Sequence, residues 1–204
     1  MFEVYEYDFR VLEDYEILEK VVIGNEQLSS KTDMLWHHDK SFEQIPPPYV
    51  AMQCLKIDPA ASPTYFADLL QAYKEAPQKL KDKAENMICK HSLGNYTKQS
   101  DNYPINFANR THERYFRLHS RTEHPLVLET ELGKMFYYST GYVDAGDLTK
   151  ELNDHCFQDK YIMTHHWKPG QLVLWDNFRY PHARDKTDDN LDRRFIRYGL
   201  RKNS

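Results

Sequence analysis

The sequence lacks the features of a membrane-spanning or exported chain. No stretch approaches the roughly 18 consecutive apolar residues of a membrane-spanning helix. The first six residues, from Met1 to Glu6, are acidic and aromatic, whereas a signal peptide begins with basic residues and continues with apolar ones. We therefore expect a cytoplasmic protein with no membrane partner.

Cysteine is also scarce. The three cysteines, Cys54, Cys89 and Cys156, lie far apart and show no CxxC spacing. An odd number at such distances predicts neither a disulfide framework nor a zinc knuckle. We expect three buried thiols in a reducing compartment.

An excess of basic residues is missing too. The formal net charge is −4, which argues against a nucleic-acid partner, since such a protein needs a strong basic excess. Basic residues do gather near the C-terminus, at Arg193, Arg194, Arg197, Arg201 and Lys202. In a strand-like segment such a cluster is ordinarily a solvated edge.

What is present indicates one β-rich domain. A chain of 204 residues, 40% hydrophobic and 28% charged, can build a single domain with a substantial core. Fifteen Tyr and ten Phe suit strands. No repeat, linker or low-complexity tract divides the chain, so we expect residues 1–204 to form a single domain.

Several short strands with Pro and Gly turns are expected. The predicted strands are residues 49–57, 125–130, 134–140, 161–167, 171–175 and 193–200; the predicted helices are 63–75, 77–94 and 148–157. This order favours a mainly β architecture with flanking helices (α+β), a sandwich or jelly roll, over a βαβ sheet.

Two segments outside this series carry separate expectations. Residues 93–120 lose periodicity and are polar and aromatic, and so long a loop predicts a lid-like insertion. Near the N-terminus, Tyr5, Tyr7, Phe9 and Val11 alternate like a strand that could pair across a homo-oligomer.

One short motif can carry metal chemistry. About one His-x-Asp pair is expected by chance in this composition, and one occurs, at His37-His38-Asp39. On an extended segment, His37 and Asp39 point the same way. A second histidine would complete the two-histidine, one-carboxylate triad that holds iron with one face open. A structural zinc site would more often use cysteine.

The residues around this motif resemble a known family. Trp36-His37-His38-Asp39-Lys40-Ser41-Phe42 resembles the Trp-His-x-Asp block of the TauD/TfdA dioxygenases (taurine and 2,4-dichlorophenoxyacetate dioxygenases). In the family this block is followed by a proline-containing turn, a strand, a threonine and a helix with Ala-Tyr. Each of these features has a counterpart in this sequence, in the same order. They are residues 46–48, residues 50–57, Thr64 and Ala72-Tyr73.

The second half of the chain continues the resemblance. His124-Pro125-Leu126-Val127 and Gly133-Lys134 are similar to the family's His-Pro-x-Val and Gly-Arg/Lys hairpin. Residues 175–182 are similar to its Trp-Asn-Asn/Asp-Asn-Arg block, which ends in the distal histidine, and Arg193-Arg194 stands where its arginine pair does. The resemblance covers about residues 35–200.

This resemblance implies a fold, a reaction and roles for named residues. The fold would be a cupin-like double-stranded β-helix (jelly roll). His37, Asp39 and His182 would bind Fe(II) and form the catalytic centre. Arg194 would clamp the distal carboxylate of 2-oxoglutarate, aided by Thr64; Arg193 and Arg197, expected on the other strand face, are weaker candidates. Oxidative decarboxylation of 2-oxoglutarate by O₂ would yield succinate and CO₂. This reaction would be coupled to hydroxylation of a small-molecule substrate.

Two departures from the family bear on the substrate. The position four residues after Arg194 holds Tyr198, where sulfonate- and aryloxyacetate-oxidising members have an anion-binding arginine. Tyr198 offers no positive charge, so we expect neither taurine nor a chlorophenoxy acid as substrate, and Tyr198 and Asp33 are the candidate substrate contacts. Asp33 lies where the family often places a polar substrate contact, and a carboxylate there suits an amino acid or amine. Family members also carry a longer N-terminal region than the 36 residues before His37. We expect a compact variant, a truncated product or a protomer covered by its neighbour.

Two other functions fit parts of the sequence. A catalytically silent jelly-roll protein could keep the metal and 2-oxoglutarate sites without turnover. A zinc-dependent hydrolase or isomerase on a cupin-like barrel would need no 2-oxoglutarate and leaves Arg194 without a role. Succinate release with Fe(II) and O₂ separates all three.

Overall fold

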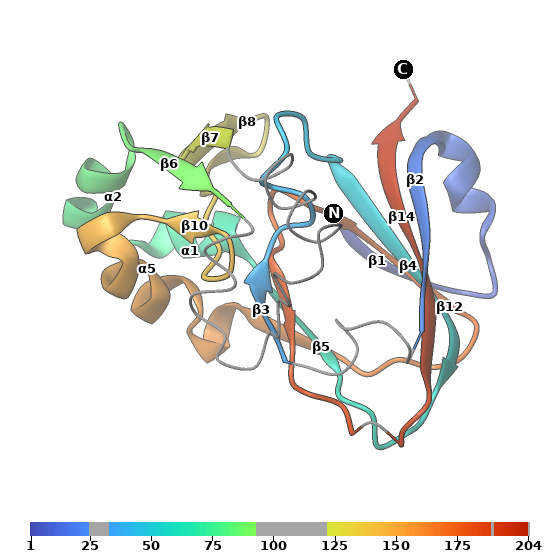
Figure 1. Ribbon diagram of the computed structural model, residues 1–204. Coiled ribbons are helices and arrows are strands. Elements are labelled where there is room, and N and C mark those ends of the chain that lie inside the picture. The colour runs from blue at the N-terminus through green and yellow to red at the C-terminus, as the bar shows by residue number, and fades with distance from the viewer. Residues whose placement is uncertain (25–32, 93–121, 189, 204) are drawn as a thin grey trace, which may run out of the picture.

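The computed structural model describes residues 1–24, 33–92, 122–188 and 190–203, and these are built mainly of β-strands (Figure 1). The predicted lid-like insertion at residues 93–120 lies outside the described residues. Within the described ranges, no helix is both long and apolar enough to cross a membrane.

The largest sheet of the described chain has five antiparallel strands. Its spatial order is β1 (Phe2–Glu6), β12 (Gln171–Asp176), β4 (Tyr49–Ile57), β14 (Arg193–Lys202) and β2 (Tyr15–Ile23). The predicted strands at residues 49–57 and 193–200 are confirmed as β4 and most of β14. The β1 strand pairs with β12 of the same chain. Of the alternating residues Tyr5, Tyr7, Phe9 and Val11, only Tyr5 lies in β1, and the prediction of a strand through Val11 is wrong because the chain turns at Tyr7 and continues as a 3₁₀ turn from Arg10.

A four-stranded sheet lies beside it. Its order is β11 (Ile162–His165), β5 (Thr64–Ala67), β13 (His182–Arg184) and β3 (Met34–His37). The faces of the two sheets share one core, in which Phe66 of the smaller sheet packs with Trp175 and Phe195 of the larger. Two packed antiparallel sheets, with few helices, agree with the predicted jelly roll.

Helices and two small sheets occupy the other end of the molecule (Figure 1). The helices there are α1 (Leu69–Glu75), α2 (Gln78–Ala84) and α5 (Thr149–Cys156). Three short 3₁₀ turns are described: η3 (Gly146–Leu148) and η4 (Asp159–Tyr161) flank α5, whereas η1 (Arg10–Asp14) lies beside β2 at the large sheet. The small sheets are β10 (Val143–Asp144), β6 (Ile88–His91) and β7 (Thr122–Pro125), and the hairpin β8 (Val127–Thr130) with β9 (Gly133–Phe136).

Two predicted helices are shorter than the sequence suggested. The region expected to be a helix at residues 63–75 begins as β5, and Asp68 then caps α1 by accepting hydrogen bonds from two backbone amides. The helix expected at 77–94 ends at Ala84, and β6 follows. In both places strand pairing overrides helical spacing, because β5 lies between two strands and β6 pairs with β7.

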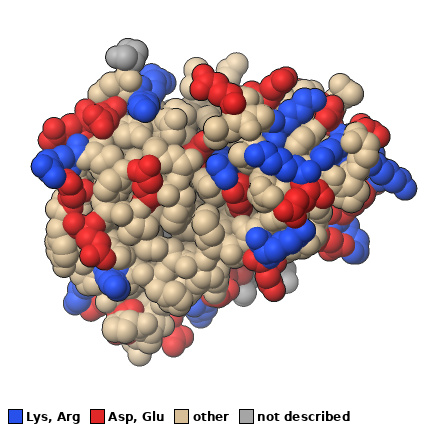
Figure 2. Space-filling model, turned by 180° about the vertical axis from the view of Figure 1, so that it is seen from behind, with Lys and Arg blue, Asp and Glu red and all other residues tan. Residues whose placement is uncertain are grey.

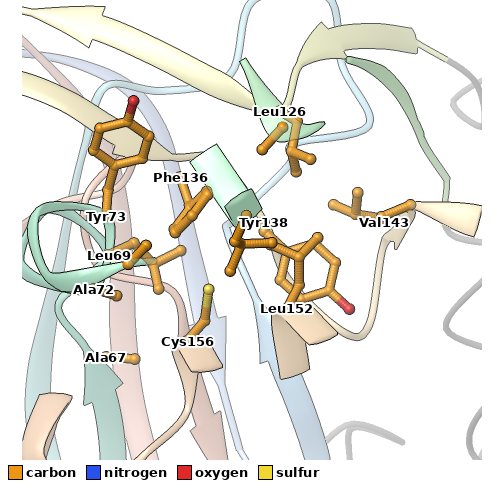
Figure 3. Close-up of a cluster of buried hydrophobic side chains, with 14 of the residues drawn as sticks. Ala67, Leu69, Ala72, Tyr73, Leu126, Phe136, Tyr138, Val143, Leu152 and Cys156 are labelled. Atoms are coloured by element: carbon orange, nitrogen blue, oxygen red, sulfur yellow. The ribbon is translucent and has the colours of Figure 1, made fainter. Parts of the chain in front are cut away.

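The helical end has its own hydrophobic core. Figure 3 shows Leu69 and Ala72 of α1 beside Phe136, with Leu152 and Cys156 of α5 close by. These side chains are fully buried. Helices of seven or eight residues are unstable alone. Burial of apolar surface contributes about 25 cal/mol of stability per Å² removed from water, and this packing holds the short helices against the barrel.

The surface charge is mixed rather than separated by sign. Figure 2 shows acidic and basic side chains interspersed on the rear face, with a broad uncharged area between them. Several of these charges form ion pairs between elements, such as Lys83 with Glu151 at 2.7 Å. Exposed pairs of this kind add little stability each.

Candidate metal centre

Pairing between two short strands brings the two predicted histidines together. His37 is the last residue of β3 and His182 is the first of β13, and the register places them directly opposite each other. Their ring centroids are 4.1 Å apart. Asp39 follows His37 by two residues, beyond the end of β3.

The three side chains converge on one point. Asp39 Oδ1 lies 3.7 Å from His37 Nε2 and 3.9 Å from His182 Nε2. One donor atom from each residue lies within 4.8 Å of the others, and all three residues are buried. Two imidazoles and a carboxylate around a common centre fit a divalent metal ion.

The protonation states also fit a metal. His37 Nδ1 lies 2.7 Å from the carbonyl oxygen of Leu35, which favours the tautomer with the proton on Nδ1 and a free lone pair on Nε2. Burial lowers the pKa of both His37 and His182, so both rings are neutral near pH 7. Neutral imidazole is the form that binds metals.

Asp39 is ionised in spite of its burial. Burial works to raise its pKa, but the charge of Arg197 beside it works the other way, and the pKa falls to about 2. Arg197 Nη1 lies 2.8 Å from Asp39 Oδ2. The arginine therefore contacts the carboxylate oxygen that faces away from the histidines.

Asn177 holds the segment that carries Asp39. Its side-chain oxygen accepts a hydrogen bond from the Asp39 amide at 2.9 Å, and its amide group donates to the carbonyls of Asp39 and Pro47. Asn177 is fully buried, between β12 and β13. The Trp175–His182 block thus supplies both a histidine and the support for the carboxylate, a role that the sequence motif did not reveal.

His38, between the two predicted ligands, has a structural position. Its ring is fully buried, with Nδ1 2.6 Å from the Asn177 carbonyl and Nε2 3.2 Å from that of Tyr138. Burial lowers its pKa to about 4. His38 therefore faces away from the triad, as the alternation of an extended segment predicts.

The structure does not bring Arg194 to the site. Arg194 is exposed, while Arg193 is buried, with its guanidinium 4.5 Å from the centre of the Phe195 ring. The two expected faces of β14 are therefore exchanged: Arg193 and Arg197 point inward. Arg194 pairs with Lys56 and Phe195 with Cys54, so the extra residue of the β-bulge, Leu55, lies in β4 and the alternation of β14 is uninterrupted. The prediction was out of phase by one residue, and such a shift reverses every side chain.

Tyr198 is also directed away from the triad. It packs in the cluster on the outer side of the large sheet with Tyr15 and Leu200, and its hydroxyl donates to Gln53 at 3.0 Å. Asp33 lies half-buried directly before β3, at the edge of the described residues. The structure thus separates Tyr198 from the triad. With the faces of β14 exchanged, Arg197 rather than Tyr198 stands four residues after the inward-facing arginine.

Thr64 is placed inside the barrel. It is buried, and its hydroxyl accepts a hydrogen bond from Trp167 Nε1 at 2.9 Å. Trp167 packs edge-on against Phe195, over which Arg193 lies. Thr64 and Arg193 therefore each contact one ring of this aromatic pair, Thr64 that of Trp167 and Arg193 that of Phe195.

Aromatic side chains adjoin the triad on another side. The Tyr142 ring lies 5.7 Å from that of His37 and 5.3 Å from that of Phe42, and Leu35 packs against this pair. Phe42 belongs to the block around His37, but Tyr142 comes from the segment after β9. No sequence motif pointed to Tyr142.

Comparison with known proteins agrees with this geometry. Residues 13–198 match the family described as "Taurine catabolism dioxygenase TauD, TfdA family". The chain is 27% identical over 170 residues to the alpha-ketoglutarate-dependent 2,4-dichlorophenoxyacetate dioxygenase of Cupriavidus pinatubonensis, covering 76% of this chain and 55% of that protein. It is 26% identical over 181 residues to the (S)-phenoxypropionate/alpha-ketoglutarate-dioxygenase of Sphingobium herbicidovorans, covering 82% and 59%.

A solved structure shares the fold. The crystal structure of AAD-2 in complex with Mn(II) and N-oxalylglycine superposes with a TM-score of 0.72 at 23% sequence identity, covering 94% of this chain and 73% of that one. The mainly β jelly roll predicted from the sequence is thereby confirmed. The chain spans little more than half the length of the two related dioxygenases.

Proposed function

Because this chain belongs to the taurine catabolism dioxygenase TauD, TfdA family, we propose that it is an Fe(II)- and 2-oxoglutarate-dependent dioxygenase that hydroxylates a small molecule. One observation carries the proposal: two neutral imidazoles and an ionised carboxylate, all buried, converge within 4.8 Å. This donor set is typical of iron oxygenases that leave one metal face open.

His37, Asp39 and His182 hold the metal in this proposal. Bound Fe(II) supplies the redox chemistry by which 2-oxoglutarate and O₂ become succinate and CO₂ while one oxygen atom enters a C–H bond of the substrate. The protein's own contribution is to present three donors from one side and to exclude water by burial. Asp39 also balances one of the two metal charges.

We assign Arg193, in place of Arg194, to the distal carboxylate of 2-oxoglutarate. Burial, and then the nearby charge of Arg184, lower the pKa of Arg193 to about 9. A buried cation beside a second cation favours an anionic ligand, and a planar guanidinium can bind a carboxylate through two hydrogen bonds. N-oxalylglycine, named with the AAD-2 structure, has the same two-carboxylate form as 2-oxoglutarate.

Thr64 supports the same carboxylate. Its hydroxyl oxygen already accepts from Trp167, so its hydrogen is available to donate to an anion. Trp167 would then orient the Thr64 hydroxyl. The Trp167 ring packs against Phe195, and the Arg193 guanidinium lies over the Phe195 ring.

The substrate side of the proposal concerns size and charge. Tyr142 and Phe42 next to His37 suit an apolar portion of a small organic molecule. Asp33 remains our candidate for binding an amine on that molecule. The related proteins are named for phenoxy acids and for alkyl sulfates, so these two substrate classes also belong in any screen.

The decisive experiment follows the co-substrate. The anaerobic protein with Fe(II) and 2-oxoglutarate should develop a visible metal-to-ligand charge-transfer band, which the His182→Ala variant should lack. Admitting O₂ should release succinate, and a panel of amino acids, amines, phenoxy acids and alkyl sulfates should include a compound that accelerates this release. A band without succinate would favour a silent binding protein, and no band at all would contradict the proposal.

A further inference from the structure

The two histidines of the triad are oriented in different ways. His37 Nδ1 lies 2.7 Å from the carbonyl oxygen of Leu35, and this hydrogen bond fixes the plane of its ring. His182 Nδ1 is buried, and no group in the described part of the chain forms a hydrogen bond with it. The last torsion of a histidine side chain is broad, so some other contact has to select one orientation of the His182 ring.

Aromatic rings pack around His182. Trp175 lies edge-on to the imidazole, with ring centroids 5.1 Å apart and an interplanar angle of 68°. Phe66 is stacked on it, with centroids 5.9 Å apart and an angle of 28°. Phe66 and Trp175 also meet edge-on, at 5.1 Å. The three rings therefore form a closed triangle, at the centroid separations that aromatic pairs prefer.

Strand pairing brings these rings together. His182 of β13 lies directly opposite Phe66 of β5, and the alternation of β5 points Phe66 into the core while the neighbouring Tyr65 is turned toward the surface. On the facing sheet, the alternation of β12 places Trp175 in the same core. Both Phe66 and Trp175 are fully buried, so neither ring can move aside without disturbing a close-packed interior.

Resting on the proposed function, we propose that Phe66 and Trp175 are positioning residues that orient the His182 imidazole by ring packing, in place of a hydrogen bond. Nε2 of His182 faces Oδ1 of Asp39 at 3.9 Å. Rotation of the imidazole would turn Nε2 away from this point and drive the ring into Phe66 or Trp175. The two aromatic rings therefore keep one imidazole nitrogen directed at the metal centre.

Two other aromatic residues of the same core provide matched controls. Phe195 is fully buried and Trp167 is 7% exposed, and their rings meet edge-on at 4.9 Å. They belong to the same core cluster as Phe66 and Trp175. Within the described ranges, neither control residue forms a ring contact with His182. Leucine at any of these four positions removes a ring from one core, but at only two of them from beside the histidine.

The test titrates the metal-free protein with Co(II) and records the Co(II) d–d absorption. 2-Oxoglutarate is omitted, because Trp167 and Phe195 contact the residues that we assign to it. We expect Phe66→Leu and Trp175→Leu each to weaken Co(II) binding by about 10–100-fold, the usual effect of removing a group that orients a metal ligand. The d–d band should shift in both, since a misdirected imidazole changes the ligand field. Phe195→Leu and Trp167→Leu should keep the wild-type band and affinity.

Two further measurements separate positioning from core packing. Circular dichroism gives the Tm of each metal-free variant, and all four leucine variants should lose stability because each leaves unfilled volume in the core. Co(II) affinity should fall only in the pair beside His182. Trp175→Phe keeps an aromatic ring next to the imidazole and should bind Co(II) more tightly than Trp175→Leu.

The possible outcomes distinguish this inference from the proposed function. Wild-type Co(II) affinity and spectrum in Phe66→Leu would overturn the positioning role, and so would equal weakening in the two control variants. If Trp175→Leu does not fold, the comparison of Phe66→Leu with Phe195→Leu decides the inference. A wild-type protein that gives no Co(II) band at all would contradict the metal centre and the proposed function with it.

Discussion

Arg179 and Asp68 form a two-point ion pair, from Nε to Oδ1 at 2.9 Å and from Nη2 to Oδ2 at 2.5 Å. Arg179 lies three residues before His182, and Asp68 also caps the first turn of α1 by accepting from the amides of Leu70 and Gln71. One half-buried carboxylate therefore connects the helical end of the molecule to the segment that leads into the metal centre.

We predict that Asp68→Ala lowers the free energy of unfolding by about 2–4 kcal/mol, because it removes a helix cap and leaves a half-buried arginine without its partner. Urea denaturation followed by circular dichroism measures this. Asp82→Ala, which removes an exposed hydrogen bond with Gln78 on α2, should change it by no more than about 0.5 kcal/mol. Equal losses in the two variants would contradict the cap and bridge.

Metal binding should stabilise the fold. A divalent metal at about 100 times its dissociation constant adds about 2.7 kcal/mol if it binds only the folded chain. For a chain of this size that corresponds to a rise in Tm of roughly 5–10 °C. Differential scanning fluorimetry with Mn(II), and with EDTA as the reverse, measures the shift. The His182→Ala variant should show none, and an equal shift there would place the metal elsewhere.

Arg193 and Arg194 offer a direct test of which face of β14 binds 2-oxoglutarate. Arg193→Met should raise the KM for 2-oxoglutarate at least about tenfold, since a hydrogen bond to a charged group contributes about 1.5–3 kcal/mol. Arg194→Met alters the neighbouring, exposed side chain and should leave KM within about twofold. The reverse result, with Arg194→Met the damaging variant, would restore the expectation drawn from the sequence.

The three cysteines should be unreactive in the folded protein. Burial raises the pKa of Cys54 and of Cys89 to about 11 and raises that of Cys156 still further. Near pH 8 a thiol with a pKa of 11 is only about 0.1% thiolate, the reactive form. Ellman's reagent should therefore detect no thiol in the native protein at pH 8 and all three in denaturant. Rapid native labelling would show that a cysteine is accessible.

Much of the metal centre was determined by the sequence. His37 and Asp39 are two residues apart in an extended segment, which places both on one side, and the block ending at His182 supplied the third donor. These predictions depend on local spacing, which the backbone converts directly into direction. The β-rich architecture was equally accessible, because short strands between Pro and Gly turns are also a local property.

The tertiary structure decided which arginines of β14 turn toward the interior. Along β14, alternation alone leaves two possible phases, and the pairing with β4, in which Arg193 lies opposite Ile57 and Phe195 opposite Cys54, goes with the phase that turns Arg193 and Arg197 inward. The same holds for Glu19, which reaches Arg197 only because β2 pairs with β14. Register is set by contacts between distant segments, so the sequence alone predicted the candidate metal-binding triad, whereas the packed sheets determined which charged side chains lie beside it.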